Sequence, residues 1–281
     1  MAEPTLAAAA RAVLVTSDPA AKVRRARAAA RDWRLGRLAH VFDVTMPDEP
    51  ARPAQPELLP PNRMPKRGRG GSTENRIALI HALAHIEFAA IDLAFDLVGR
   101  FGGEFPRAFA DQWMKVGAEE AMHFALLDRR LRALGAAYGD LPAHGGLWDA
   151  AAMTADDALA RIAIVPMVLE ARGLDVTPAT LARFEAAGDE ATVRILRRIL
   201  ADEINHVRAG TYWFEFACSA RRVAPAETWR GIVSARFRGS LKEPFNDSAR
   251  AAAGLTRDYY AGLAPAPRTR REGDDTGGGG T

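Results

Sequence analysis

Two copies of one short motif, each at the same distance after a lone glutamate, constrain this chain more than any other feature. The motif Glu-x-x-His occurs at residues 120–123 and again at residues 203–206. The interval from Glu87 to the first motif equals the interval from Glu170 to the second. The sequence therefore predicts a repeated helical hairpin, in which each copy brings two carboxylates and one imidazole to the interior.

The spacing within each motif suits metal binding. Residues three apart lie on one helix face, so the Glu and the His of a motif can reach the same metal. Glu87 and Glu170 come from other helices and can bridge or chelate. Four Glu and two His inside a helix bundle form the ligand set of a dinuclear iron or manganese site, and four carboxylates offset two divalent ions. The sequence predicts six metal ligands: Glu87, Glu120, His123, Glu170, Glu203 and His206.

Both lone glutamates lie among apolar residues. On a helical wheel, Ile80, Ala84 and Ile91 fall within about 60° of Glu87, and an unpaired carboxylate on such a face would be costly. Glu170 ends the apolar run 162–169, which contains Pro166. A proline inside a helix frees a carbonyl and bends the axis. The bend either tilts Glu170 toward the metals or is a packing kink.

Composition favours a soluble, all-α protein. Alanine is abundant, and long stretches have the 3.6-residue period of helices. The one cysteine, Cys218, excludes a disulfide framework and a Cys-rich zinc or rubredoxin module, and is expected to be a buried helix residue. We expect no stretch long and apolar enough to cross a membrane, and no signal peptide in the interrupted apolar run 6–15. A cytoplasmic location follows by default.

The pattern divides the chain into three parts. Residues 1–71 are expected to form an N-terminal helical arm, with helices over about 5–16 and 17–37, followed by a Pro/Arg/Gly-rich strap. Residues 72–255 are expected to form the bundle that holds the dimetal site, and residues 256–281 a disordered tail. Within the bundle we expect four long helices, over about 74–101, 106–134, 154–173 and 190–219. We also expect a crossover over about 138–148, a short interrupting helix over about 178–187 and an extra C-terminal helix over about 225–238.

Several stretches carry a resemblance to a known superfamily. They are residues 81–87, 119–124, 138–144, 170–175 and 202–207. On these, the chain resembles the ferritin-like superfamily of di-iron carboxylate proteins, and within it a bacterial ferritin-like family of long-unassigned function. The resemblance covers about residues 60–255. It implies a ferritin-like four-helix bundle with a long crossover and two bound iron ions, with manganese an alternative at one or both positions.

The resemblance also implies which acids orient the histidines. An acid precedes the motif Glu in many di-iron helices, where it accepts the imidazole N–H of the ligand on the other hairpin. Asp202 would thus orient His123, and Glu119 would orient His206; the alternative for either acid is surface solvation. Catalytic residues other than the metal ligands are not assigned.

A second polar stripe lies on the helix of Glu87. His81, His85, Asp92 and Asp96 share a face away from Glu87, so they are not expected to bind the same metal. They are expected to form a structural His–Asp network or to bind the crossover, the strap or a neighbouring helix.

The basic residues are clustered although the net charge is only +3, with a pI of about 9.3. The clusters include Arg24 to Arg37 with Lys22, Arg63 to Arg69, and Arg268 to Arg271. They could contact phosphate, but solvated surface charge is favoured.

Two classes of function remain open. The first, implied by the resemblance, is an enzyme that uses two iron ions to reduce O₂ and hydroxylate or oxidise a small molecule or a tRNA, with an unknown electron donor. The second is a ferroxidase or iron store, which the N-terminal arm and C-terminal extension argue against, because they would obstruct cage packing. A third reading gives the metals only a structural role. A homodimer is one expected assembly, and no membrane partner is expected.

Overall fold

The computed structural model describes residues 4–65 and 71–263, and within these ranges the protein is helical and has no strand. The all-α prediction is confirmed. The helices, in chain order, are α1 (Leu6–Leu14), α2 (Pro19–Arg34), η1 (Pro61–Arg63), α3 (Thr73–Phe101), η2 (Gly102–Glu104), α4 (Arg107–Ala133), α5 (Gly146–Ala152), α6 (Ala158–Ile164), η3 (Val165–Glu170), α7 (Ala171–Ala186), α8 (Glu190–Arg221), α9 (Pro225–Arg236), α10 (Asp247–Ala252) and α11 (Arg257–Tyr260).

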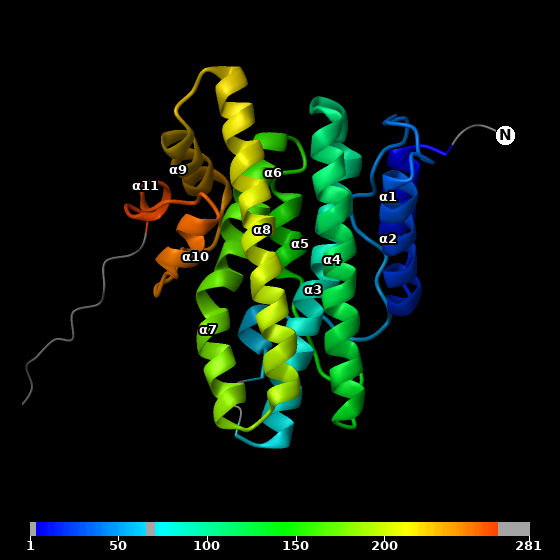
Figure 1. The fold of residues 1–281 in the computed structure, drawn as a ribbon, viewed down its shortest axis with the longest axis vertical. Coiled ribbons are helices and arrows are strands. Elements are labelled where there is room, and N and C mark those ends of the chain that lie inside the picture. Colours follow the sequence, from blue (N-terminus) through cyan, green and yellow to red (C-terminus); the bar gives the residue numbers. More distant parts are fainter. Residues whose placement is uncertain (1–3, 66–70, 264–281) are drawn as a thin grey trace, which may run out of the picture.

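Four long helical rods form the centre of the molecule. They are α3, α4, the continuous run α6–η3–α7, and α8 (Figure 1). α3 packs along α4, α7 packs along α8, and α4 and α8 meet where the two hairpins face one another. The two long hairpins therefore place the interiors of four rods around one shared core.

Local sequence signals set the ends of these rods. The side chain of Ser72 accepts a hydrogen bond from the backbone of Asn75 at the start of α3, and Asp189 does the same for Thr192 at the start of α8. After α4, Gly135 adopts a φ of +82°, which a residue without Cβ reaches at little cost. The helices expected over about 17–37, 74–101 and 106–134 match α2, α3 and α4 to within three residues at each end.

The first rod of the second hairpin differs from the prediction. A short helix, α5, begins inside the expected crossover and extends beyond its end at 148, and the helix expected to end near Gly173 continues through Pro178 to the end of α7. Proline removes the hydrogen bond to the carbonyl four residues earlier, which belongs to Leu174. That carbonyl instead accepts a hydrogen bond from Asn246 Nδ2 at 3.1 Å. A side chain distant in sequence thus compensates for the proline, which local pattern reading cannot detect.

The N-terminal helices belong to the same core as the bundle and are not a separate arm. α1 packs on α3, and α2 packs on α4 (Figure 1). Lys22 of α2 forms a buried ion pair with Asp92 of α3, so Lys22 is not part of a solvated basic face. Asp96 on the same helix pairs with Arg161 and Arg100. The expected His–Asp network is therefore replaced, for both aspartates, by buried ion pairs with basic residues.

The C-terminal segment is also packed. The predicted extra helix is α9, which packs on α6 and α8, while α10 packs on α7 and α8 and α11 packs on α9 (Figure 1). Tyr259 and Tyr260 of α11 are buried, so folded chain continues past the expected tail boundary at 256. The rest of that tail, from 264, lies outside the described residues.

The hydropathy of α3 corrects one expectation. The segment Thr73–Glu104 is long and apolar enough to cross a membrane, with a mean hydropathy of 1.6, although no such stretch was expected. In the most apolar 18-residue window of this segment, 61% of the window is buried inside the protein. The apolar side chains of α3 are therefore accounted for by its central place in the bundle. Cys218 is fully buried in α8, as expected.

Candidate metal centre

The structure brings the six predicted ligands together at mid-height of the bundle. Glu87 comes from α3, the first motif from α4, Glu170 from the last position of η3, and the second motif from α8. His123 and His206 are fully buried, and Glu120 is 1% exposed. Each of the four rods thus contributes at least one potential ligand, and all six are buried except the half-buried Glu170.

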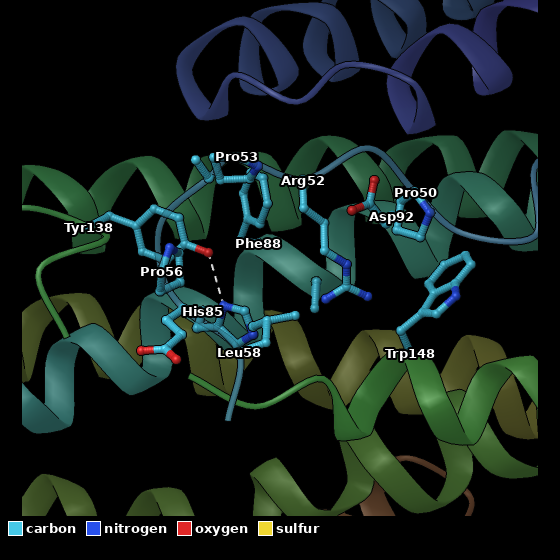
Figure 2. A pocket seen from close by; sticks show the side chains of 13 residues that line it. Pro50, Arg52, Pro53, Pro56, Leu58, His85, Phe88, Asp92, Tyr138 and Trp148 are labelled. Atoms are coloured by element: carbon cyan, nitrogen blue, oxygen red, sulfur yellow. Dashed lines mark hydrogen bonds between the residues drawn. The ribbon is translucent and has the colours of Figure 1, made fainter. Parts of the chain in front are cut away.

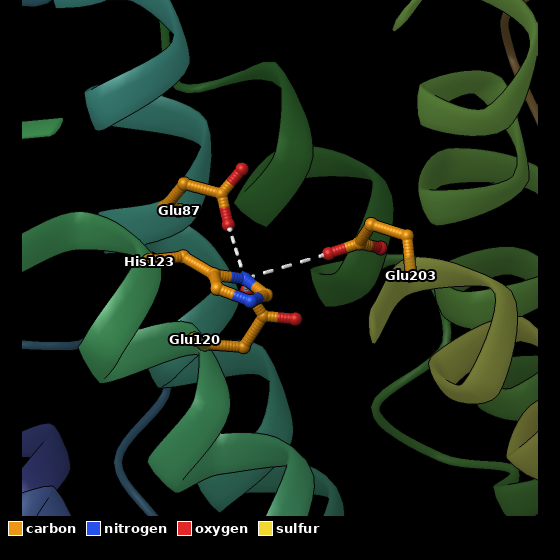
Figure 3. Close-up of side chains that lie close together, drawn as sticks. All are labelled: Glu87, Glu120, His123 and Glu203. Atoms are coloured by element: carbon orange, nitrogen blue, oxygen red, sulfur yellow. Dashed lines mark hydrogen bonds and ion pairs between the residues drawn. The ribbon is translucent and has the colours of Figure 1, made fainter. Parts of the chain in front are cut away.

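The ligand atoms form two groups with one member in common. In the first, one donor atom each from Glu87, Glu120, His123 and Glu203 lies within 4.8 Å of all the others (Figure 3). In the second, Glu170, Glu203 and His206 satisfy the same criterion. Glu203 belongs to both groups, which is the placement expected of a carboxylate that bridges two ions.

Glu120 also lies between the two histidines. Its Oε2 is 3.5 Å from His123 Nδ1, and its Oε1 is 2.8 Å from His206 Nδ1. Glu203 Oε1 is 3.8 Å and 3.4 Å from the same two nitrogens. The two motif glutamates therefore occupy the middle of the site, with Glu87 and Glu170 on its two sides. The sequence analysis gave bridging or chelation as roles for Glu87 and Glu170, whereas this geometry places the motif glutamates between the two histidines.

Several of these atoms are buried without a hydrogen bond, which is how a metal-ligand set differs from a structural network. Among the described residues, both carboxylate oxygens of Glu120, Glu170 Oε2 and His206 Nδ1 have no hydrogen-bond partner. The short contact between Glu120 Oε1 and His206 Nδ1 is not aligned as a hydrogen bond. Orphaned buried polar groups are costly. These oxygen and nitrogen atoms point into a shared space and are not hydrogen-bonded to one another. The residues therefore fit a bound cation.

The outer nitrogen of each imidazole is held by an acid from the other hairpin. His123 Nε2 lies 3.1 Å from Asp202 Oδ2, and His206 Nε2 lies 3.1 Å from Glu119 Oε2. Each Nε2–H can donate to its acid, which leaves Nδ1 facing the cluster. Both hydrogen bonds were predicted with these partners.

Sequence reasoning missed one member of this network. Arg198 Nε donates to Asp202 Oδ2 at 2.6 Å and lies one helical turn before it. An Arg four residues before an acid on a helix is a readable pairing signal.

Charge in the cluster is unbalanced without cations. Burial raises the pKa of Glu87 to about 8 and also raises the pKa values of Glu170 and Glu203, with neighbouring carboxylates adding to the effect. For Glu120, burial is outweighed by the charges of the nearby His206 and His123, so its pKa is lowered.

The imidazoles respond in the opposite sense. Burial works against their charged forms, but the adjacent carboxylates raise the pKa of His123 to about 11 and raise that of His206 as well. Metal ions would bind here in competition with protons, since only deprotonated carboxylates and neutral imidazoles act as ligands.

An irregular turn carries Glu170. Residues Val165–Glu170 form a π-helix, in which the backbone N–H of Ala171 reaches the carbonyl of Pro166. The ring of Pro166 packs on Gly210 of α8 so closely that an added Cβ there would lie 2.5 Å from Pro166 Cβ. Pro166 thus lies both in a close packing contact with α8 and in the irregular turn that presents Glu170. π-turns inside helices often occur at functional sites.

His81 and His85 lie away from the cluster and hold the crossover. His85 Nδ1 lies 2.9 Å from the Tyr138 hydroxyl, and its Nε2 lies 3.2 Å from the His144 carbonyl. His81 Nε2 accepts a hydrogen bond from the backbone of Gly139 at 3.0 Å. The expectation that these histidines bind the crossover is confirmed.

Comparisons with known proteins give one family match and one curated relative. The model of a family described as "Protein of unknown function (DUF455)" matches residues 15–261. An uncharacterized protein from Haemophilus influenzae is 39% identical over 213 residues, which cover 74% of each of the two chains. No solved structure matches the chain.

Proposed function

We propose that this chain, which belongs to the DUF455 family, is a non-haem di-iron protein that activates O₂ to hydroxylate or oxidise a substrate. The description of the family assigns no function, so the proposal rests on the geometry of the site. The bundle would be of the ferritin-like type, with Glu87, Glu120, His123, Glu170, Glu203 and His206 as metal ligands.

The observation that carries the proposal is the pair of overlapping donor groups. Four carboxylates and two imidazoles meet in a buried space, and Glu203 is common to both groups. Oxygen and imidazole donors suit iron or manganese, and the described residues place no cysteine among them. Two ions that share motif carboxylates would remove the orphaned atoms of Glu120 and His206 at once.

The residues around the ions have separate tasks in this proposal. When bound, iron would supply the electrons for O₂ reduction. Asp202 and Glu119 fix the direction of the two imidazoles through their Nε2 hydrogen bonds. Ala84 and Ile91, one turn on either side of Glu87, are fully buried and shield the Glu87 face of α3 from bulk water.

Ferroxidase or iron-handling activity is the alternative, and the outer faces of the bundle argue against a storage cage. α1 and α2 cover α3 and α4, while α9 packs on α6 and α8 and α10 packs on α7 and α8 (Figure 1). A cage needs exposed bundle faces that pack on identical copies.

A tRNA substrate is supported only by charge. Arg24, Arg27, Arg31 and Arg34 are exposed on α2, and exposed arginines can contact phosphate. The expected clusters at Lys66 to Arg69 and at Arg268 to Arg271 lie outside the described residues. A small-molecule substrate therefore remains the first choice.

Iron stoichiometry tests the proposal. The full chain would be titrated with Fe(II) without oxygen and then exposed to O₂, while bound and oxidised iron are counted and the optical spectrum is followed. Saturation at about two irons per chain, with an optical transient on oxygenation, supports the proposal. Continued uptake far beyond two would indicate storage, and no tight iron binding would remove the basis for di-iron chemistry.

A further inference from the structure

A cavity of about 310 Å³ lies on the side of α3 that does not carry Glu87. Its roof is the strap segment around residues 50–58, its floor is α3, and Tyr138 and Trp148 close two of its sides (Figure 2). Ala54, Glu57 and Leu58 of its lining are exposed, so the cavity opens to solvent along the strap. None of its lining residues belongs to either metal-ligand group. Its size suits a small organic molecule.

Arg52 is the uncommitted charge in this cavity. Its side chain extends from the strap into the cavity (Figure 2). No hydrogen bond or ion pair joins its guanidinium to another described residue, whereas Asp92 below it is already paired with the buried Lys22. The other lining acid, Glu57, is exposed at the rim. A planar guanidinium without a partner is suited to bind a carboxylate through two parallel hydrogen bonds.

Tyr138 supplies an acceptor in the same cavity. His85 Nε2 faces the carbonyl oxygen of His144, which can only accept, so this nitrogen carries the hydrogen. His85 Nδ1 then accepts from the Tyr138 hydroxyl at 2.9 Å. The lone pairs of that hydroxyl oxygen remain available to a donor in the cavity.

The walls between these two polar groups are apolar and partly flat. They consist of Phe88, Trp148 and the rings of Pro50, Pro53 and Pro56 (Figure 2). The Trp148 indole N–H is already donated to the Asp48 carbonyl at 3.1 Å, so Trp148 offers its ring and not its hydrogen. Such walls favour a planar, apolar body.

We propose that this cavity is a binding site for a small aryl carboxylate that carries a hydroxyl group, separate from the metal centre. The carboxylate binds Arg52, the ring lies against Phe88 and Trp148, and the hydroxyl donates to Tyr138. The proposal does not depend on which metal the cluster holds or on whether the protein is an oxygenase.

Three matched probes test this arrangement on the full-length protein. 4-Hydroxybenzoate has both polar groups, 4-hydroxybenzamide lacks the charge, and benzoate lacks the hydroxyl. Binding is measured from the chemical-shift change of the Trp148 indole N–H resonance, assigned with Trp148→Phe. We expect 4-hydroxybenzoate to bind at least about tenfold more tightly than the amide, the gain typical of a hydrogen-bonded charge. It should bind about three- to tenfold more tightly than benzoate, the gain typical of a neutral hydrogen bond.

Two substitutions assign each preference to its residue. Arg52→Met should abolish the preference for acid over amide, and Tyr138→Phe should abolish the preference for 4-hydroxybenzoate over benzoate. Arg63→Met, an exposed arginine of the same part of the chain that does not line the cavity, should change neither preference.

Several outcomes would overturn the proposal. One is equal affinity for acid and amide in the unsubstituted protein, and another is an equal loss of preference in Arg63→Met. The absence of any Trp148 shift up to about 10 mM probe would do the same, because ligands of this size reach millimolar affinity in a site that fits them. Since Arg52 lies on a surface strap, Arg52→Met keeps the test valid even if Tyr138→Phe fails to fold.

Discussion

The two hairpins of the bundle carry the same proposed metal ligands at the same spacing, yet they present them with different backbones. In the first, α3 is an unbroken α-helix, and Glu87 Oε2 lies within hydrogen-bonding distance, 3.1 Å, of His123 Nδ1. In the second, the corresponding rod contains the π-helix η3, and Glu170 Oε2 has no partner among the described residues. The first group also has four members and the second three.

This difference separates two ways of building a ligand. Glu87 is held by regular helix geometry and a hydrogen bond, so its position is largely set before a metal arrives. Glu170 depends on an irregular turn that is wedged against α8 at Gly210. We therefore expect the first position to bind metal more tightly and the second to be more sensitive to changes in packing.

Glu203→Ala should have the largest effect, because it removes the ligand shared by the two groups. We expect affinity at both positions to fall by at least about 100-fold, the upper end of what losing a supporting partner costs. Glu87→Ala and Glu170→Ala should each affect mainly one position. Metal content after anaerobic Fe(II) loading measures the difference.

The matched control is Glu190→Ala, which makes the same change on α8 at an exposed side chain. The metal-free Glu203→Ala protein should be at least as resistant to heat as the parent, because it loses one of several crowded buried carboxylates. Full occupancy of both positions in Glu203→Ala would show that it is not a shared ligand.

Asp202→Asn and Glu119→Gln should have the next largest effect, each on the hairpin opposite to its own. Each weakens the hydrogen bond to one imidazole Nε2, so we expect about a 10- to 100-fold loss of affinity at the position of His123 or of His206, respectively. The affinity at each position would be measured by competition with a chelator, with the optical spectrum of the metal at that position as the signal. An equal loss at both positions in either variant would contradict the crossed pairing.

Gly210→Ala and Gly117→Ala compare the packing of the two hairpins directly. An added Cβ would lie 2.5 Å from Pro166 Cβ in the first case and 2.6 Å from the Phe95 ring in the second. Overpacking of this kind costs about 1–3 kcal/mol of stability. Denaturant unfolding should show similar losses in both, but only Gly210→Ala should weaken binding at the Glu170 position. A weakened Glu170 position in Gly117→Ala as well would mean that η3 is not the sensitive element.

Asn246→Ala should have the smallest effect and should act on the second hairpin alone. It leaves the Leu174 carbonyl opposite Pro178 without its partner and removes the side-chain cap of α10. We expect a loss of about 1–2 kcal/mol in the free energy of unfolding, measured with urea. The neighbouring Ser248→Ala should stay within about 0.5 kcal/mol. An unchanged stability in Asn246→Ala would mean that α7 tolerates its proline without help.

Features that depend on residues close together in the sequence could be predicted, and features that depend on distant residues could not. The long helices α3, α4 and α8 and the convergence of the six proposed ligands could be predicted, because helix periodicity and three-residue spacing are local. The continuity of α7 was not, because the group that compensates for Pro178 comes from Asn246, far along the chain. The burial of Lys22 was missed for the same reason, since its partner Asp92 lies on another helix. The role of η3 was only partly foreseen, because a proline predicts a disturbed helix but not the kind of turn that results.

The π-helix has a consequence for the history of the repeat. A π-turn accommodates an extra residue within an otherwise continuous helix, and η3 takes it up before Glu170 rather than after it. The interval from Glu170 to its motif therefore stays equal to the interval in the first hairpin. If the hairpins descend from one duplicated ancestor, a single inserted codon ahead of Glu170 could alter one copy while its metal ligands stayed in register. An alignment of the two halves should then hold from the glutamates onward and slip by one position in front of them.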